Sequence, residues 1–289
     1  MHVKKPFNLK CRFKMTKRTG PIGIFDSGYG GLTVFKEIEK KLPQYDYIYL
    51  GDNARVPYGI RSFETVYQYT WECVQHLFRM GCRLVILACN TASAKALRSI
   101  QQKDLLKLKE LHRVLGVIRP TTEIVGDFTL SGHVGVMGTQ GTVTSNSYQI
   151  EIKKFFPETE VYQQACPLWV PLVESNEHES AGADFFVDKY INQLLGQSSE
   201  IDTIILACTH YPLLINKIKK YLPKHIKLLS QGEIVANSLQ DYLHRHPEIE
   251  LLCNKTGNVD FYTTESTDDF DAKAAIFLGK KVSSAHLSL

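Results

Sequence analysis

The sequence predicts an α/β protein with mainly parallel sheets, organised as two pseudo-symmetric domains that face each other across a cleft. Short apolar runs alternate with amphipathic helical patterns along the chain, which is typical of layered α/β folds. Gly-rich turns follow two of the apolar runs, and segments 85–91 and 204–210 are closely similar. The alternation predicts the parallel sheets, and the similar segments predict the pairing of two domains.

The first half of the chain contains strand-like runs separated by helical patterns. In order, we expect a strand at 21–26, a Gly-rich turn at 27–31, a helix at 32–41, a strand at 45–50, a helix between Ser62 and Gly81, and a strand at 84–89. Ser62 can accept a hydrogen bond from the first turn of its helix, and Gly81 is suited to ending that helix. The run at 84–89 is apolar throughout, as expected for a strand buried on both faces of a parallel sheet.

The second half repeats this order. We expect a strand at 134–137, a Gly-rich turn at 138–141, a helix near 146–156, a strand at 203–208 and a helix that starts after Pro212. Segments 85–91 (VILACNT) and 204–210 (IILACTH) both place a cysteine directly after an apolar strand and a polar pair after the cysteine. We therefore infer two related α/β domains.

The composition is that of an ordinary globular protein, with 289 residues, 44% of them hydrophobic and 22% charged. Five basic residues and no acid lie within residues 1–14, and subtracting these five charges from the net charge of +4 leaves −1 for the rest. We expect residues 1–20 to be a basic, disordered extension, either a regulatory arm or the result of a start assigned upstream of Met15. The near-neutral remainder argues against direct nucleic-acid binding, and no apolar run approaches the ~20 residues of a membrane span.

The seven cysteines, at positions 11, 73, 82, 89, 166, 208 and 253, form no C-x-x-C pair. This argues against a zinc or redox motif and predicts reduced thiols in a cytoplasmic protein. Free cysteines are commonly small buried apolar side chains. We adopt that interpretation for Cys73, Cys82, Cys166 and Cys253.

Polar residues follow the predicted strands at the edge where open α/β sheets bind ligands. They are Asp26-Ser27, Cys89-Asn90-Thr91, the segment from Thr139 to Thr142, and Cys208-Thr209-His210. Each has an ordinary structural alternative: a buried thiol for each cysteine, a turn cap for Asp26, and a core histidine for His210. The matched settings of Cys89 and Cys208 favour a shared chemical role.

Two opposed thiols are suited to inverting a carbon centre, because one can remove a proton from one face while the other returns a proton to the opposite face. An unperturbed thiol has a pKa of about 8.5. We expect the N-terminus of a following helix, or an imidazolium such as His210, to lower the pKa of each thiol. Asp26 would assist the Cys89 thiol or bind a substrate ammonium group.

The run at 26–31 (DSGYGG) looks like a phosphate-binding loop but lacks the required spacing. Thr33 stands where the last glycine of G-x-G-x-x-G would be, and no G-K-[ST] follows. We interpret this run as backbone that approaches a small carboxylate ligand at a helix N-terminus. No residue pattern marks a lysine that would bind pyridoxal phosphate.

Together these motifs resemble those of the bacterial glutamate racemases, within the aspartate/glutamate racemase superfamily. The matching segments are 24–34 (IFDSGYGGLTV), 51–59 (GDNARVPYG), 88–92 (ACNTA), 171–174 (PLVE), 207–213 (ACTHYPL) and 277–279 (FLG). The resemblance extends from about residue 21 to the end of the chain, and the segments are jointly specific.

The resemblance implies a cytoplasmic enzyme that interconverts L- and D-glutamate without cofactor or metal and so supplies D-glutamate for peptidoglycan. Cys89 would take the proton of D-glutamate with the assistance of Asp26. Cys208 would take that of L-glutamate, assisted by His210, which Glu174 steadies. The substrate would be held by Asp26, Ser27, Pro57, Tyr58, Gly59, Asn90, Thr91, Thr139, Thr142, Thr209 and His210. Several of these offer donors to carboxylates, which only accept hydrogen bonds when ionised.

The resemblance also implies the domain limits and the partners. Residues 21–113 and 230–289 would form the first domain and residues 114–229 the second, with the active site in the cleft between them. We expect a homodimer that contacts neither membrane nor nucleic acid. Three alternatives stay open: a racemase for aspartate or another amino acid, a non-catalytic amino-acid-binding regulator, and an inhibitor of a nucleic-acid enzyme.

Overall fold

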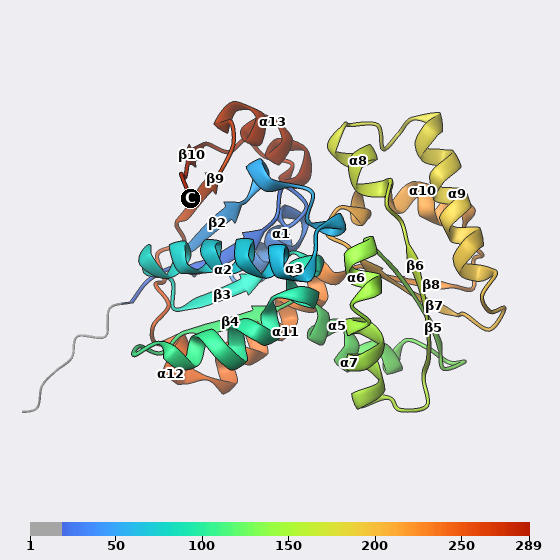
Figure 1. Ribbon diagram of the computed structural model, residues 1–289, viewed down its shortest axis with the longest axis horizontal. Helices are drawn as coiled ribbons and strands as arrows, with labels where there is room; N and C mark the ends of the chain where they lie inside the picture. The colour runs from blue at the N-terminus through green and yellow to red at the C-terminus, as the bar shows by residue number, and fades with distance from the viewer. Residues whose placement is uncertain (1–18) are drawn as a thin grey trace, which may run out of the picture.

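In this computed structural model, residues 19–289 are described, and they form two parallel sheets with helices on both faces (Figure 1). The larger sheet has the strand order β10-β9-β2-β1-β3-β4 and the smaller one β6-β5-β7-β8. The strands are β1 Ile22–Asp26, β2 Tyr47–Gly51, β3 Leu84–Leu87, β4 Arg113–Gly116, β5 His133–Gly138, β6 Glu160–Ala165, β7 Thr203–Ala207, β8 Lys227–Leu229, β9 Val259–Thr263 and β10 Ser284–His286. The predicted α/β class with mainly parallel sheets in two domains is confirmed.

The helices divide between the two sheets. Those around the larger sheet are α1 Leu32–Lys41, α2 Phe63–Arg79, α3 Asn90–Lys95, α4 Leu97–Ser99, α11 Gln231–Arg245, α12 Pro247–Glu250 and α13 Thr267–Leu278. Those around the smaller sheet are α5 Ile118–Ile124, α6 Gln140–Thr144, α7 Ser147–Phe155, α8 Trp169–Glu174, α9 Ala181–Leu195 and α10 Ile215–Tyr221. Shorter turns of helix are η1 Asn53–Arg55, η2 Tyr58–Ile60, η3 Ile100–Asp104, η4 Leu105–Lys107, η5 Val125–Asp127 and η6 Tyr211–Leu214.

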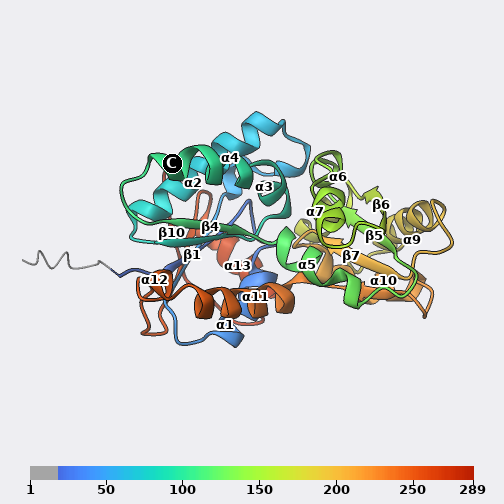
Figure 2. The ribbon, with the colours of Figure 1, turned by 90° about the horizontal axis from the view of Figure 1, so that it is seen from below.

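Alternating side chains of β1 build two separate cores on the larger sheet. Ile22 and Ile24 pack with Phe35 of α1 and Leu239 of α11 on one face. Phe25 points to the other face, where α2 and α3 complete a second apolar cluster. Figure 2 shows these helices on opposite sides of the sheet. Both faces of the central strands are therefore buried from solvent, which explains their continuous apolar sequences.

The smaller sheet is built in the same way. Val136 and Ile205 pack with Tyr148 and Ile152 of α7 on one face. Met137 and neighbouring residues of β7 pack with α9 and α10 on the other. The two sheets lie side by side in both views, with α3 and α6 near the boundary (Figures 1 and 2).

Local signals in the sequence place several elements well. Helix α1 has the bounds expected, and the Ser62 hydroxyl caps α2 by accepting from the Thr65 N–H at 3.1 Å. The expected turn at 138–141 is instead the start of the short helix α6. Residues 1–18 of the predicted basic extension lie outside the described residues. Gly20, at the end of that predicted extension, forms a β-bridge with Cys253.

Candidate active site

The candidate residues lie at the carboxyl ends of β1, β3, β5 and β7. Strand β3 ends at Leu87, two residues earlier than expected, so Cys89 lies just beyond it. There the Cys89 sulfur caps α3, accepting from the Ala92 N–H at 3.4 Å. Cys208 directly follows β7, which pairs with β5 up to Ala207 and Gly138. Each sheet therefore presents one thiol at the end of a central strand.

The Cys89 thiol is buried beside Ser27 and Asp26. Its sulfur lies 3.4 Å from the Ser27 hydroxyl oxygen, and the residue is 6% exposed. Burial raises the pKa of Cys89 to about 12, and the charges of Asp26 and Cys208 act in the same direction. The expected lowering of this pKa is therefore wrong, because the hydrogen bonds from Ser27 and the Ala92 N–H are outweighed.

Asp26 is fully buried at the end of β1. Its Oδ2 accepts a hydrogen bond from the Gly28 N–H at 2.9 Å, which closes the turn that leads into α1. Its Oδ1 has no hydrogen bond of good geometry within the described chain, although the Gly31 N–H lies nearby. Burial raises the pKa of Asp26, and the charge of His210 partly opposes that rise. This carboxyl group is therefore available to a cationic or N–H-bearing ligand.

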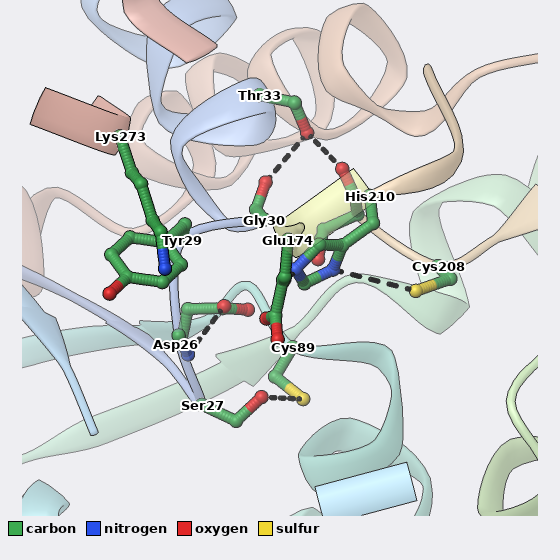
Figure 3. Close-up of polar contacts among 12 residues, drawn as sticks. Asp26, Ser27, Tyr29, Gly30, Thr33, Cys89, Glu174, Cys208, His210 and Lys273 are labelled. Atoms are coloured by element: carbon green, nitrogen blue, oxygen red, sulfur yellow. Dashed lines mark hydrogen bonds and ion pairs between the residues drawn. The ribbon is translucent and has the colours of Figure 1, made fainter. Parts of the chain in front are cut away.

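The Cys208 thiol faces His210, whose other ring nitrogen contacts Glu174 (Figure 3). Its sulfur lies 3.9 Å from Nδ1 of His210, and Nε2 of His210 lies 2.9 Å from Oε1 of Glu174. Burial opposes charging of the imidazole, but the hydrogen bonds to Cys208 and Glu174 outweigh it and raise the pKa of His210 to about 10. His210 is therefore a cation at neutral pH, in contact with a sulfur on one side and a carboxylate on the other.

Contacts outside the site hold Cys208, His210 and Glu174 in place. Trp169 opens α8, and its ring lies across that of Tyr211 with centroids 4.7 Å apart. This contact sets Glu174, the last residue of α8, against His210. From the other domain, the Thr33 hydroxyl lies 2.8 Å from the Thr209 carbonyl oxygen and donates to it.

The Gly-rich turn is needed for this close approach. A Cβ atom at Gly30 would lie 2.4 Å from Nδ1 of His210 and 2.4 Å from the Thr209 hydroxyl oxygen. A side chain there would therefore displace the imidazole or the turn. The turn therefore lets one domain approach the other. The expectation that its backbone also approaches a small carboxylate ligand stays a prediction.

Three threonines meet across the boundary between the domains. The Thr91 hydroxyl oxygen, on α3, lies 2.9 Å from that of Thr139 and 3.4 Å from that of Thr142. Thr139 caps α6 and accepts from the Thr142 N–H at 3.2 Å. A Cβ atom at Gly59 would lie 2.9 Å from that of Thr139, so η2 packs directly against this threonine cluster. These hydroxyl groups form a cluster that can bind an anionic oxygen.

The side chains of some other candidate residues are hydrogen-bonded within the protein. The Tyr58 hydroxyl donates to Asp52 at 2.5 Å, and Pro57 precedes η2 after a cis peptide bond. The Asn90 amide is bonded to Tyr148 and Gln231. Of these, Tyr148 and Gln231 were not identified from the sequence, because neither belongs to a strand-end motif.

No metal centre or membrane helix is found in the part of the chain that the structure describes. Residues 19–289 contain no group of three His, Cys, Asp or Glu side chains placed to hold a metal ion. None of the helices in this range has the length and apolar character that crossing a membrane requires. A cavity of about 1090 Å³ lies beside α3, α5 and α11, and none of the candidate residues lines it. Converging polar groups, and not cavity size, define the candidate site.

Known proteins are similar to this chain in sequence and in architecture. The sequence model described as Asp/Glu/Hydantoin racemase matches residues 22–239. The glutamate racemase of Persephonella marina is 40% identical over 268 residues, which cover 93% of this chain and 97% of that protein. That of Geobacter metallireducens is 41% identical over 261 residues, which cover 90% and 93%.

Solved structures agree in fold. The glutamate racemase isoform RacE1 from Bacillus anthracis superposes with a TM-score of 0.85 at 36% identity, covering 93% of this chain and 98% of that one. The enzyme from Francisella tularensis in complex with D-glutamate gives 0.82 at 31% identity, with the same coverage. The fold and these relatives define an isomerase of the amino-acid racemase class. The chain belongs to the Asp/Glu/hydantoin racemase family.

Proposed function

We propose that this chain interconverts L- and D-glutamate, with Cys89 and Cys208 as the two acid/base groups on opposite faces of the substrate. One observation supports this most strongly. Each of the two sheets ends a central strand at a buried thiol, and the two thiols have different polar partners, Ser27 for Cys89 and His210 for Cys208. Two such groups can exchange protons with both faces of one carbon.

In the L-to-D direction, the Cys208 thiolate takes the α-proton, and the electron pair of that C–H bond passes into the substrate carboxylate. The Cys89 thiol then donates its proton to the opposite face, so a new C–H bond forms. Cys208 ends as a thiol and Cys89 as a thiolate, and the D-to-L direction reverses each step. No oxidant or reductant is consumed, so the chemistry can proceed without a cofactor.

The protonation states in the free protein suit this sequence of steps. The pKa of about 12 keeps Cys89 a thiol, ready to donate. The His210 cation beside the Cys208 sulfur stabilises negative charge there. Between turnovers, Asp26, whose charge acts on Cys89, and His210, which contacts Cys208, are titratable groups through which the two sulfurs can return to their starting states.

Substrate binding would draw on the polar groups around the two thiols. Glutamate carries two carboxylates, which need donors, and one ammonium group, which needs an acceptor. The Thr91, Thr139 and Thr142 hydroxyls supply donors, and the unpaired Oδ1 of Asp26 supplies an acceptor. Glutamate is also the amino acid in the names of the Persephonella marina and Geobacter metallireducens relatives.

The cellular role follows from the substrate. We infer that the chain acts in the cytoplasm, supplies D-glutamate for peptidoglycan, and works as a homodimer. The reduced cysteines predicted from the sequence support the compartment, since both catalytic thiols must stay unoxidised.

The proposal is tested with purified protein and no added cofactor. L-glutamate and L-aspartate are incubated separately, and formation of each D-isomer is followed by chiral chromatography. We expect turnover of glutamate at least 100-fold faster than that of aspartate. Cys89→Ser and Cys208→Ser should each abolish racemisation.

Cys253→Ser is the matched control, because Cys253 is also 6% exposed and its thiol donates to the Ile249 carbonyl, as a hydroxyl can. It should retain near-normal activity. Turnover of aspartate alone would overturn the substrate, and near-normal turnover by either Cys89→Ser or Cys208→Ser would overturn the mechanism.

A further inference from the structure

Three buried side chains form a closed ring of hydrogen bonds next to Cys89. The Asn90 Nδ2 donates to Oε1 of Gln231 at 2.7 Å, and Nε2 of Gln231 donates to the Tyr148 hydroxyl at 2.7 Å. The Tyr148 hydroxyl donates in turn to Oδ1 of Asn90 at 2.6 Å. These residues are 2%, 3% and 0% exposed, so water does not compete for the bonds.

The direction of the ring is fixed by one backbone group. The Gln231 Nε2 lies 3.0 Å from the Val117 carbonyl oxygen, which can only accept. This places the Gln231 nitrogen towards Val117 and its oxygen towards Asn90. The Asn90 nitrogen must then face Gln231, which leaves the Asn90 oxygen for the Tyr148 O–H. All three side chains therefore have one consistent arrangement of donors and acceptors.

The ring joins the parts of the fold whose relative position sets the site. Asn90 directly follows Cys89 and begins α3. Tyr148 lies on α7, which covers the smaller sheet. Val117 precedes α5 where the chain first passes from the larger sheet to the smaller one, and Gln231 begins α11 where it returns. One amide side chain thus contacts both connections and both domains.

We propose that Gln231 is a positioning residue that holds Cys89, through Asn90, at its correct distance from the substrate carbon. This inference rests on the proposed function. Cys208 has separate supports in His210 and in the Thr33 contact to Thr209, and neither belongs to the ring. Loosening the ring should therefore impair proton transfer at Cys89 more than at Cys208. A displacement of about 1 Å at a reacting group can cost about 100-fold in rate.

The test uses two variants that disturb the ring differently. Gln231→Met keeps the length of the side chain but removes its donors and acceptor. Tyr148→Phe removes one hydroxyl group and keeps the ring packing. Gln101→Met is the matched control, because Gln101 also donates to a backbone carbonyl, that of Val114 at 2.8 Å, without touching the ring.

We expect kcat to fall about 10- to 100-fold in both ring variants, with KM changed less than threefold. Deuterium isotope effects identify the step that is slowed. With α-deuterated D-glutamate, whose bond Cys89 breaks, the isotope effect on kcat/KM should rise. With α-deuterated L-glutamate, whose bond Cys208 breaks, it should fall. Gln101→Met should leave kcat, KM and both isotope effects as in the unmodified chain.

Contrary results separate this inference from the proposed function. A fall in kcat with unchanged isotope effects, or with equal changes in both, would show a general structural role and overturn the inference. Unaltered kinetics in Tyr148→Phe and Gln231→Met would do the same. If the unmodified chain fails to racemise glutamate, it is the proposed function that fails.

Discussion

Glu174 is one of the two partners, after Cys208, that raise the pKa of His210, and its replacement by glutamine tests how the Cys208 side works. The Glu174 carboxylate accepts from Nε2 of His210 at 2.9 Å, and His210 is 4% exposed. A hydrogen bond to a charged partner contributes about 1.5–3 kcal/mol. Since one pKa unit corresponds to about 1.36 kcal/mol, losing the charge should lower the pKa of His210 by about 1–2 units. From about 10 it would fall to about 8–9.

The sign of the pH effect follows from the raised pKa of His210. Because the folded state binds this proton more tightly, the stabilisation is complete below the ordinary histidine pKa of about 6.5. It is lost as the pH rises to about 10 in the unmodified chain. In Glu174→Gln the loss should be complete by about pH 8–9, since the folded pKa is lower.

The assay is kcat/KM for L-glutamate between about pH 6 and pH 11, a range that brackets the ordinary and raised pKa values of histidine. Above its pKa, His210 can no longer support a thiolate at Cys208, so activity should fall. We expect this alkaline decline near pH 10 in the unmodified chain and about 1–2 units lower in Glu174→Gln. Glu177→Gln is the control, because Glu177 is exposed three residues further on. An alkaline decline at the same pH in both variants would refute the assigned role of Glu174.

Two further predictions concern close packing and helix capping. Gly30→Ala should lower kcat at least 10-fold, because its Cβ would lie 2.4 Å from His210 Nδ1, whereas Gly182→Ala, where the nearest atom is 3.5 Å away, should keep full activity in the same assay. Ser62→Ala should cost about 1 kcal/mol of unfolding free energy by removing the cap of α2, with activity unchanged. Chemical denaturation measures that loss, and an unaltered midpoint would contradict it.

Local sequence chemistry accounts for the parts of the fold that could be predicted. The apolar runs at 22–26 and 84–87 are buried on both faces, so their composition alone identifies central strands. Ser62 before α2 is a capping signal that acts within one turn. Strands β9 and β10 were not predicted, since they join the larger sheet beside β2 from a distant part of the chain.

In the candidate site, too, some features could be predicted from the sequence and others could not. The strand ends bring Asp26, Cys89 and Cys208 into electrostatic contact, as their sequence settings suggested. The pKa of Cys89 could not be predicted, because it depends on burial between two domains. The role of Gln231 could not be predicted either, because its hydrogen-bond partners lie 83 to 141 residues away in the sequence.

The hydrogen bonds of Tyr58 limit which of its atoms could contact a substrate. Tyr58 falls within a motif that suggests substrate contact, yet its hydroxyl is bonded to Asp52 and the residue is 1% exposed. Any contact with substrate from this residue would come from its backbone. A motif fixes which residues are near a site, but the hydrogen-bond partners decide which atoms remain available.

The central claim is that two thiols act on opposite faces, and the origin of the product's α-proton tests it most directly. L-glutamate is incubated with the protein in D2O and the reaction is stopped early. Two opposed groups should give D-glutamate that carries deuterium at the α-carbon, while the unreacted L-glutamate keeps its proton. A single base would carry the substrate's own proton to the other face, and protonated D-glutamate at early times would contradict the account.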